Sequence, residues 1–259
     1  MRIAPRYLPV LAVLLVAGCT NTAVPASAAG PPATTAQASP RVVSPAAPPR
    51  ITYPAHGHQK WAQAPGQRGG PDGHAGRLFN YRVLVEADIK GVTPAAFASA
   101  VQATLAAPQG WTSGGRWRFH RSAPGQPYDF TLYLATPDTR DVLCGGDRDG
   151  YTSCRHHDRS GDAVVLNVAR WVKGIPAFHG DVALYRRYQV NHEVGHELGM
   201  GHMLCPGAGE PAPVMQQQTL GMHGCTPNPW PYPARDNDLY TGVYGTYNDP
   251  PQPPDRGNS

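Results

Sequence analysis

The stretch HEVGHELGMGH, His192 to His202, decides how this 259-residue chain can fold and act. It ends the pattern DVALYRRYQVNHEVGHELG, which predicts a helix over 181–199 with Asp181 as its N-cap. His192 and His196 are four residues apart, so both side chains lie on one helix face and can bind one metal ion. Gly199 has no Cβ and can end the helix in a left-handed conformation, which lets His202 turn back as a third ligand.

Three protein ligands leave a fourth position open, which is typical of a catalytic zinc ion (Zn²⁺). Glu193 lies beside the first ligand, off the metal-binding face, and we expect it to act as general base toward water. Two alternatives remain at this point. The site can hold a metal without catalysing a reaction, or the helix is amphipathic and contains the histidines by chance, which the spacing makes improbable.

The cysteines indicate an oxidising compartment. Beyond Cys19 there are four, and an even number in an exported chain predicts two disulfides. Of the three possible connectivities we expect the local one, Cys144–Cys154 and Cys205–Cys225. A four-cysteine zinc site is the alternative, but the paired C-x-x-C spacing is absent from the sequence.

The remaining patterns predict an α+β domain. Alternating or apolar runs rich in Val, Tyr and Phe predict strands, and TPAAFASAVQATLAAP predicts a helix with Thr93 as N-cap and a buried stripe of Phe97, Val101 and Leu105. The element order, strand, helix, several strands, helix, indicates a small mixed sheet. We expect strands at 79–89, 116–120, 129–136 and 162–172, and helices at 93–107 and 181–199.

The N-terminus MRIAPRYLPVLAVLLVAGC predicts export. Two arginines precede an apolar run of about ten residues, which is too short to span a bilayer. Its ending, VAGC, resembles a bacterial lipobox, and this implies cleavage before Cys19, lipidation of that cysteine and attachment to the outer side of the cell membrane. An ordinary secretory signal, giving a secreted protein, is the alternative, and an uncleaved signal anchor is a third.

Composition sets the expected domain boundaries. Residues 20 to about 75 are rich in Ala, Pro, Ser, Thr and Gly, which predicts a disordered stalk. We therefore divide the chain into a signal peptide (1–18), the stalk (19–76), one folded domain (77–247) and a disordered tail (248–259). The formal charge of +4 includes Arg2 and Arg6, so cleavage leaves +2. A charge that small argues against a nucleic-acid partner, and we expect a monomer.

The segment from His192 to His202 resembles the extended zinc motif of the metzincin metallopeptidases. That resemblance implies a small mixed sheet over the active-site helix, an antiparallel edge strand that binds extended substrate, and a short irregular C-terminal subdomain. It also implies a methionine turn beneath the zinc, and PAPVMQQQ places Met215 there. Some metzincins bind zinc through a tyrosine two residues after that methionine, whereas this chain has Gln217. Trp230 and Tyr232 are expected either to line a substrate pocket or to pack the subdomain.

The whole chain is similar to an uncharacterised family of exported actinobacterial proteins known as metzincin-like lipoproteins. The lipobox with its Pro-rich stalk and the stretches CRHHDRSGDAVVLNVARW and VMQQQTLG carry this likeness, which implies no substrate. Our hypothesis is a lipid-anchored zinc endopeptidase that acts on peptides or proteins outside the cell membrane. The alternatives are a zinc-containing surface binding module without catalysis and a zinc hydrolase acting on cell-wall peptides.

Overall fold

A computed structural model of the chain describes residues 49–146, 149–158 and 161–259. The expected signal peptide, the lipidation site Cys19 and the first part of the expected stalk lie outside these residues. None of the helices in the described ranges is long and apolar enough to cross a membrane.

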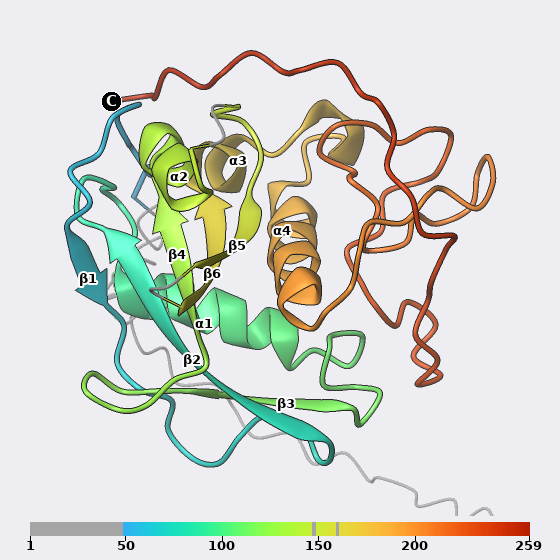
Figure 1. Cartoon of the computed structure of the whole chain (residues 1–259), viewed down its shortest axis with the longest axis horizontal. Helices are drawn as coiled ribbons and strands as arrows, with labels where there is room; N and C mark the ends of the chain where they lie inside the picture. Colours follow the sequence, from blue (N-terminus) through green and yellow to red (C-terminus); the bar gives the residue numbers. More distant parts are fainter. Residues whose placement is uncertain (1–48, 147–148, 159–160) are drawn as a thin grey trace, which may run out of the picture. The chain divides into compact units, whose positions relative to one another are not determined.

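In the part of the chain that the structure describes, six strands form one mixed sheet (Figure 1). Their order is β1-β2-β4-β6-β5, and β3 pairs with the first half of β2. The pairs of β2 with β3 and β4, and of β4 with β6, are parallel, whereas β1 and β5 run antiparallel to their neighbours. The strands are β1 (Trp61–Gln63), β2 (Arg77–Glu86), β3 (Trp117–Arg121), β4 (Phe130–Ala135), β5 (Cys154–Asp158) and β6 (Gly161–Asn167).

Within the described ranges, four α-helices and one 3-10 turn accompany the sheet, so the α+β class with a mixed sheet is confirmed. The helix α1 begins as predicted, because the Thr93 hydroxyl accepts a hydrogen bond from Ala96 N at 3.1 Å. Its predicted stripe of Phe97, Val101 and Leu105 is fully buried. The helices are α1 (Pro94–Leu105), α2 (Pro137–Leu143), α3 (Val168–Lys173), η1 (Pro176–Phe178) and α4 (Val182–Glu197).

The core lies on the sheet face that carries alternate residues of the central strands. Leu132 in β4 pairs in register with Val83 in β2 and Val164 in β6, and all three side chains are fully buried. Paired residues of neighbouring strands point to the same face, so they form one apolar layer. The helices α1 and α4 pack against each other and against this layer, and α4 lies next to β6 and the edge strand β5 (Figure 1).

The prediction of one strand over 162–172 is wrong in its second half. The strand β6 ends at Asn167, whose side-chain oxygen accepts a hydrogen bond from Ala169 N at 2.9 Å and starts α3. The asparagine thus ends the strand within the apolar run, because its side chain caps the first turn of a helix. The short elements β1, β5 and α2 were not predicted; β5 consists of the polar residues CRHHD.

The expected boundaries of the folded part are also wrong at both ends. Residues 49–76 do not behave as a stalk: they contain β1, and the side chain of Tyr53 is fully buried. The tail beyond residue 247 packs on the same segment, where Asn258 N donates to Tyr53 O at 2.9 Å. Polar composition was misleading here because a few buried anchors, among them Asp255, hold these segments in place.

Candidate metal centre

The helix α4 presents the first two histidines as the sequence predicts. Asp181 caps the helix, since its Oδ1 accepts a hydrogen bond from Leu184 N at 2.8 Å. The helix ends at Glu197, and Gly199 adopts the left-handed conformation with φ of 91°. The chain then turns, which brings His202 back to the other two histidines, as expected for a glycine-terminated helix.

The three histidines form one cluster of possible metal ligands. The ligand atoms of His192, His196 and His202 all lie within 4.8 Å of one another. The Nε2 atoms of His196 and His202 are 3.1 Å apart, and the ring centroids of His192 and His202 are separated by 5.4 Å. The chain therefore holds a group that can bind a metal ion.

Backbone carbonyls fix the orientation of the two helical imidazoles. His192 Nδ1 lies 2.8 Å from the carbonyl oxygen of Val214, and His196 Nδ1 lies 2.8 Å from that of Met200. A carbonyl oxygen only accepts hydrogen bonds, so each Nδ1 carries the hydrogen and each Nε2 keeps its lone pair for a ligand. Such outer contacts orient metal-binding histidines in proteins generally.

The surroundings keep all three imidazoles neutral near pH 7, the form that binds a metal. Burial, followed by the neighbouring histidines, lowers the pKa of His192 well below its usual value. Burial also lowers the pKa of His196, even though the Met200 carbonyl favours its protonated form. Burial lowers the pKa of His202 to about 4.

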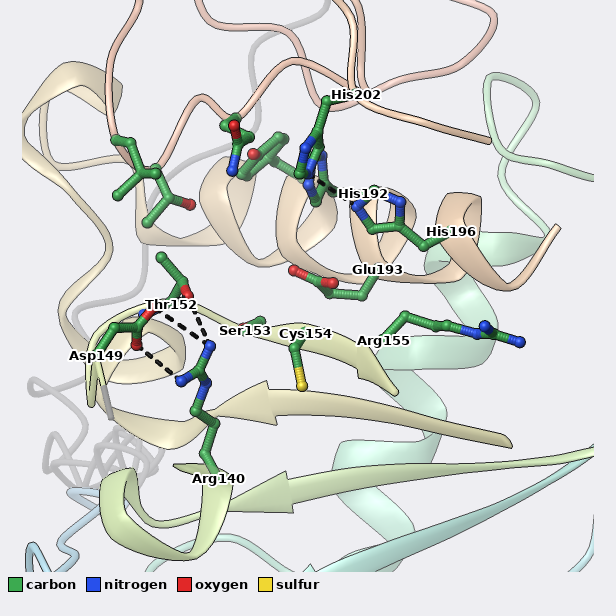
Figure 2. A pocket seen from close by; sticks show the side chains of 14 residues that line it. Arg140, Asp149, Thr152, Ser153, Cys154, Arg155, His192, Glu193, His196 and His202 are labelled. Atoms are coloured by element: carbon green, nitrogen blue, oxygen red, sulfur yellow. Dashed lines mark hydrogen bonds and ion pairs between the residues drawn. The ribbon is translucent and has the colours of Figure 1, made fainter. Parts of the chain in front are cut away.

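Glu193 lies beside the ligands and points from α4 toward β5 (Figure 2). Its residue is only 6% exposed, and its carboxylate has no hydrogen-bond or ion-pair partner in the described part of the chain. Burial raises its pKa to about 8, the charge of Arg140 opposes this shift, and that of Asp149 adds to it. Any cation held by the histidines would lower this pKa again, because it favours the ionised carboxylate.

A cavity of about 350 Å³ joins the histidines and Glu193 to a polar end formed by residues that the sequence analysis missed. At this end Arg140 NH1 pairs with Asp149 Oδ1 at 2.9 Å, and Arg140 NH2 donates to the Thr152 hydroxyl at 2.8 Å (Figure 2). No motif marks these residues, because α2 and the turn before β5 bring them to α4 only through the fold. The further lining residues are Ser153, Cys154, Arg155, Tyr188, Gln217, Thr219 and Leu220.

Arg155 links the edge strand to the metal-binding helix. It belongs to β5, and its Nε donates to Glu197 Oε2 at the end of α4 at 3.1 Å. Burial raises the pKa of Glu197, while the hydrogen bond from Arg155 opposes the shift. The same guanidinium pairs with Asp162 on β6. This ion-pair network holds β5 against α4 along one side of the cavity.

Met215 lies beneath α4, against the turn between the first two ligands. Its side chain is 1% exposed, and a Cβ added at Gly195 would lie 2.2 Å from Met215 Sδ and 2.9 Å from Trp111 Cζ2. Gly195 thus allows a methionine and a tryptophan to approach the helix backbone closely. The Met215 carbonyl oxygen also accepts a hydrogen bond from Met203 N at 3.1 Å, next to the third ligand.

Both predicted disulfides are present with the local connectivity. The Cα atoms are 6.1 Å apart in Cys144–Cys154 and 5.8 Å apart in Cys205–Cys225. These bridges indicate an oxidising environment. Of the two aromatic residues left open by the sequence, Tyr232 is fully buried and the ring of Trp230 lies against Arg187 of α4. Neither residue lines the cavity.

Comparison with known proteins places the chain in a family without defining its activity. Residues 47–233 match the family described as a protein of unknown function, DUF3152, and the chain belongs to this family. No curated protein matches the chain. No solved structure matches it either.

Proposed function

We propose that the chain is a zinc-dependent endopeptidase of the metzincin type. One observation carries the proposal: three histidines, two of them with imidazoles oriented by backbone carbonyls, converge in a cavity. The carboxylate of Glu193, which has no partner among the described residues, lines the same cavity. The resemblance of the motif to the metzincins and the position of Met215 beneath the helix support it.

The donor set fits zinc. A tetrahedral zinc ion with Zn–N bonds of about 2.0–2.1 Å places its ligand nitrogens roughly 3.3–3.4 Å apart. The Nε2 atoms of His196 and His202 are 3.1 Å apart, close to that value. The Nε2 lone pairs of His192 and His196 are available to a cation, because the Nδ1 atom of each ring donates to a backbone carbonyl. Zinc bound there would supply a Lewis acid that polarises a carbonyl group and makes water more acidic.

A side chain of the protein would transfer the proton of the attacking water. Glu193 is adjacent to the ligands and makes no hydrogen bond or ion pair within the described ranges, so its carboxylate can accept a proton from the attacking water. The same carboxyl group can then deliver this proton to the nitrogen of the leaving amine. Two carboxylates line the cavity, and Asp149 is already held by Arg140 and by the backbone N–H groups of Tyr151 and Thr152. Glu197, one turn beyond Glu193, is held by Arg155 and does not line the cavity, which makes Glu193 the candidate base.

An extended peptide is the substrate form that the surroundings favour. The edge strand β5 pairs with β6 on one side only, so its other edge can pair with a further strand. Its residues Cys154 and Arg155 line the cavity beside the histidines. A peptide bound along β5 would present its backbone carbonyls to the metal centre. This arrangement corresponds to the substrate-binding edge strand that the metzincin resemblance implies.

Glu193→Gln tests the mechanism, with Glu197→Gln as the matched control. We expect Glu193→Gln to retain bound zinc and to lose turnover by about 10²–10⁴-fold, the usual contribution of a general base. Glu197→Gln should retain most of the activity because its carboxylate lies outside the cavity. The assay offers both unfolded protein and isolated peptidoglycan, so that cleavage of the latter alone would identify a cell-wall hydrolase. Equal behaviour of wild type and Glu193→Gln on every substrate would favour the non-catalytic binding module.

We also propose that the enzyme is anchored by a lipid on Cys19 at the outer side of the cell membrane. The lipobox-like ending VAGC supports this location, and the two disulfides agree with an oxidising compartment. Cys19→Ser should release the protein from the membrane fraction and abolish incorporation of labelled fatty acid. Retention of the label in this variant would contradict the assignment.

A further inference from the structure

The C-terminal strap, which we define as residues 240–258, connects the loop of the third histidine to the first described residues (Figure 1). We propose that this strap positions His202 and thereby sets the metal affinity of the site. The inference rests on the metal centre of the proposed function, but not on peptidase activity. His202 needs such support because residues 198–259 contain no helix or strand that would hold its loop.

The near end of the strap binds the backbone directly at the third ligand. Gly245 N donates to His202 O at 3.0 Å, and Leu204 N donates to Val243 O at 2.8 Å. Cys205 N donates to the Tyr247 hydroxyl at 3.0 Å. Three successive hydrogen bonds over four residues of the loop fix its path, so the imidazole of His202 is placed by the strap.

The loop is held on its other side by the segment beneath α4. Met203 N donates to Met215 O at 3.1 Å, while Val214 O accepts the hydrogen bond from His192. The loop of His202 thus lies between the strap and the segment of Val214 and Met215. That segment also orients His192, the first ligand. If the strap leaves, the bond to Met215 and the disulfide of Cys205 with Cys225 remain, but the loop loses three hydrogen bonds to its backbone and gains freedom to move away from the two helical histidines.

The far end of the strap is anchored by a buried carboxylate. The side chain of Asp255 is 5% exposed and accepts hydrogen bonds from Lys173 Nζ at 2.7 Å, Arg170 NH2 at 3.2 Å and the Tyr53 hydroxyl at 3.2 Å. Asn258 adds two bonds to the Tyr53 backbone, each of 2.9 Å. Removing the partners of a buried carboxylate would leave its charge uncompensated, which costs more free energy than breaking an exposed ion pair. This anchor is therefore strong.

The strap also contacts the turn at the polar end of the cavity. Asp255 N donates to Gly150 O at 3.4 Å, and Gly150 follows Asp149, which lines the cavity. One continuous segment therefore contacts the third-ligand loop at one end of the cavity and the Asp149 turn at the other. Release of its anchor is expected to loosen both walls together.

The test measures metal binding by the full chain and three single variants. Asp255→Asn removes the charge that pairs with Arg170 and Lys173, and Tyr247→Phe removes only the hydroxyl that Cys205 N contacts. Asp238→Asn is the matched control, because Asp238 lies just before the strap, is exposed, and its side chain makes no hydrogen bond to another described residue. Zinc affinity is measured by competition with a chromophoric chelator, and the ligand set by the absorption spectrum of the Co²⁺ form.

We expect zinc affinity to fall about 10-fold or more in Asp255→Asn and Tyr247→Phe, the usual loss on removing an outer contact of a metal site. Their Co²⁺ spectra should show a changed ligand field, whereas Asp238→Asn should match the wild type. Wild-type affinity and spectrum in Tyr247→Phe would overturn the inference, even if Asp255→Asn failed to fold. A wild type that binds no zinc would overturn the metal centre as well. Weakened zinc binding in a protein that cleaves nothing would uphold the strap and refute only the peptidase.

Discussion

The part of the molecule from β1 to α4 and the segment after α4 satisfy their buried backbone groups in different ways. In the first part, strands and helices pair most of these groups with one another. In residues 198–259, where no helix or strand forms, side-chain amides form many of the hydrogen bonds to buried backbone groups. Gln218 Nε2 donates to Asn228 O at 2.7 Å, its Oε1 accepts from Asn228 N at 3.1 Å, and Asn228 Nδ2 donates to Ala212 O at 2.9 Å. The metal centre lies where the two parts meet.

This difference means that the two parts respond differently to local damage. A hydrogen-bonded sheet shares its backbone bonds among several strands, so the loss of one link leaves the others in place. The segment after α4 depends on single side chains and on the bridge Cys205–Cys225. Small changes there should therefore weaken metal binding more than matched changes in the first part.

Removal of each disulfide should give the largest effect. Replacing both Cys205 and Cys225 by Ser should lower the free energy of unfolding by about 3 kcal/mol, and the shorter Cys144–Cys154 loop should cost roughly 0.6 kcal/mol less. Zinc affinity should fall mainly in the first variant, because Val214 and Met215 lie within its loop, whereas β5 is still held by β6 in the second. Urea unfolding and zinc titration measure both quantities. If both variants lost zinc affinity equally, the segment after α4 would not be more closely coupled to the ligands than the first part.

Gly195→Ala tests the contact between the two parts. The added methyl group would lie far inside the contact distance of Met215 Sδ and Trp111, and such overpacking costs typically about 1–3 kcal/mol. Because Gly195 precedes His196, we also expect weaker zinc binding. Gly70→Ala is the control, since no atom lies within 4 Å of a Cβ added there and its φ is not positive. Similar melting temperatures for the two variants would show that the Met215 side chain can move aside without loss of stability.

Gln218→Ala and Gln217→Ala compare adjacent amides with opposite surroundings. Gln218 is fully buried and bonded to Asn228, so its loss leaves buried backbone groups without partners and should cost roughly 1–3 kcal/mol. Gln217 lines the cavity, and its removal should change unfolding by about 0.5 kcal/mol or less, as surface substitutions usually do. Chemical denaturation distinguishes the two. An equal loss of stability would mean that the segment is not held by its buried amides.

The sequence allowed the first part to be predicted better than the second, for a physical reason. The pattern of Phe97, Val101 and Leu105 and the alternation in β2 and β4 arise because regular elements bury every third, fourth or second side chain. The disulfide pairs followed from their short separations, and the metal cluster from the helical spacing of His192 and His196 and the turn at Gly199.

The rest depended on contacts between residues far apart in the chain, which leave no local pattern. Arg140 reaches the cavity from α2, and Asp255 is buried only because Arg170 and Tyr53 meet there. Composition alone therefore placed residues 49–76 and 248–259 outside the folded part. The strand predicted at 162–172 failed for a related reason, since the capping bond of Asn167 depends on a single side chain within an apolar run.

The smallest expected effect concerns the acid sensitivity of the strap anchor. Burial alone would raise the pKa of Asp255, but hydrogen bonds from Lys173 and Gly257 N, with the charge of Arg170, hold it below its usual value. A lowered pKa in the folded state means that this anchor contributes fully above the unfolded value of about 3.9 and is lost only as pH falls below it. Protection of the amides in residues 250–258, taken as the exchange rate relative to that of an unstructured chain at the same pH, should therefore stay high from pH 7 to about 4 and fall below. In Asp255→Asn this protection should already be low at pH 7, with little further change on acidification. If protection in the wild type disappeared between pH 7 and 5, a group other than Asp255 would be the one that holds the strap.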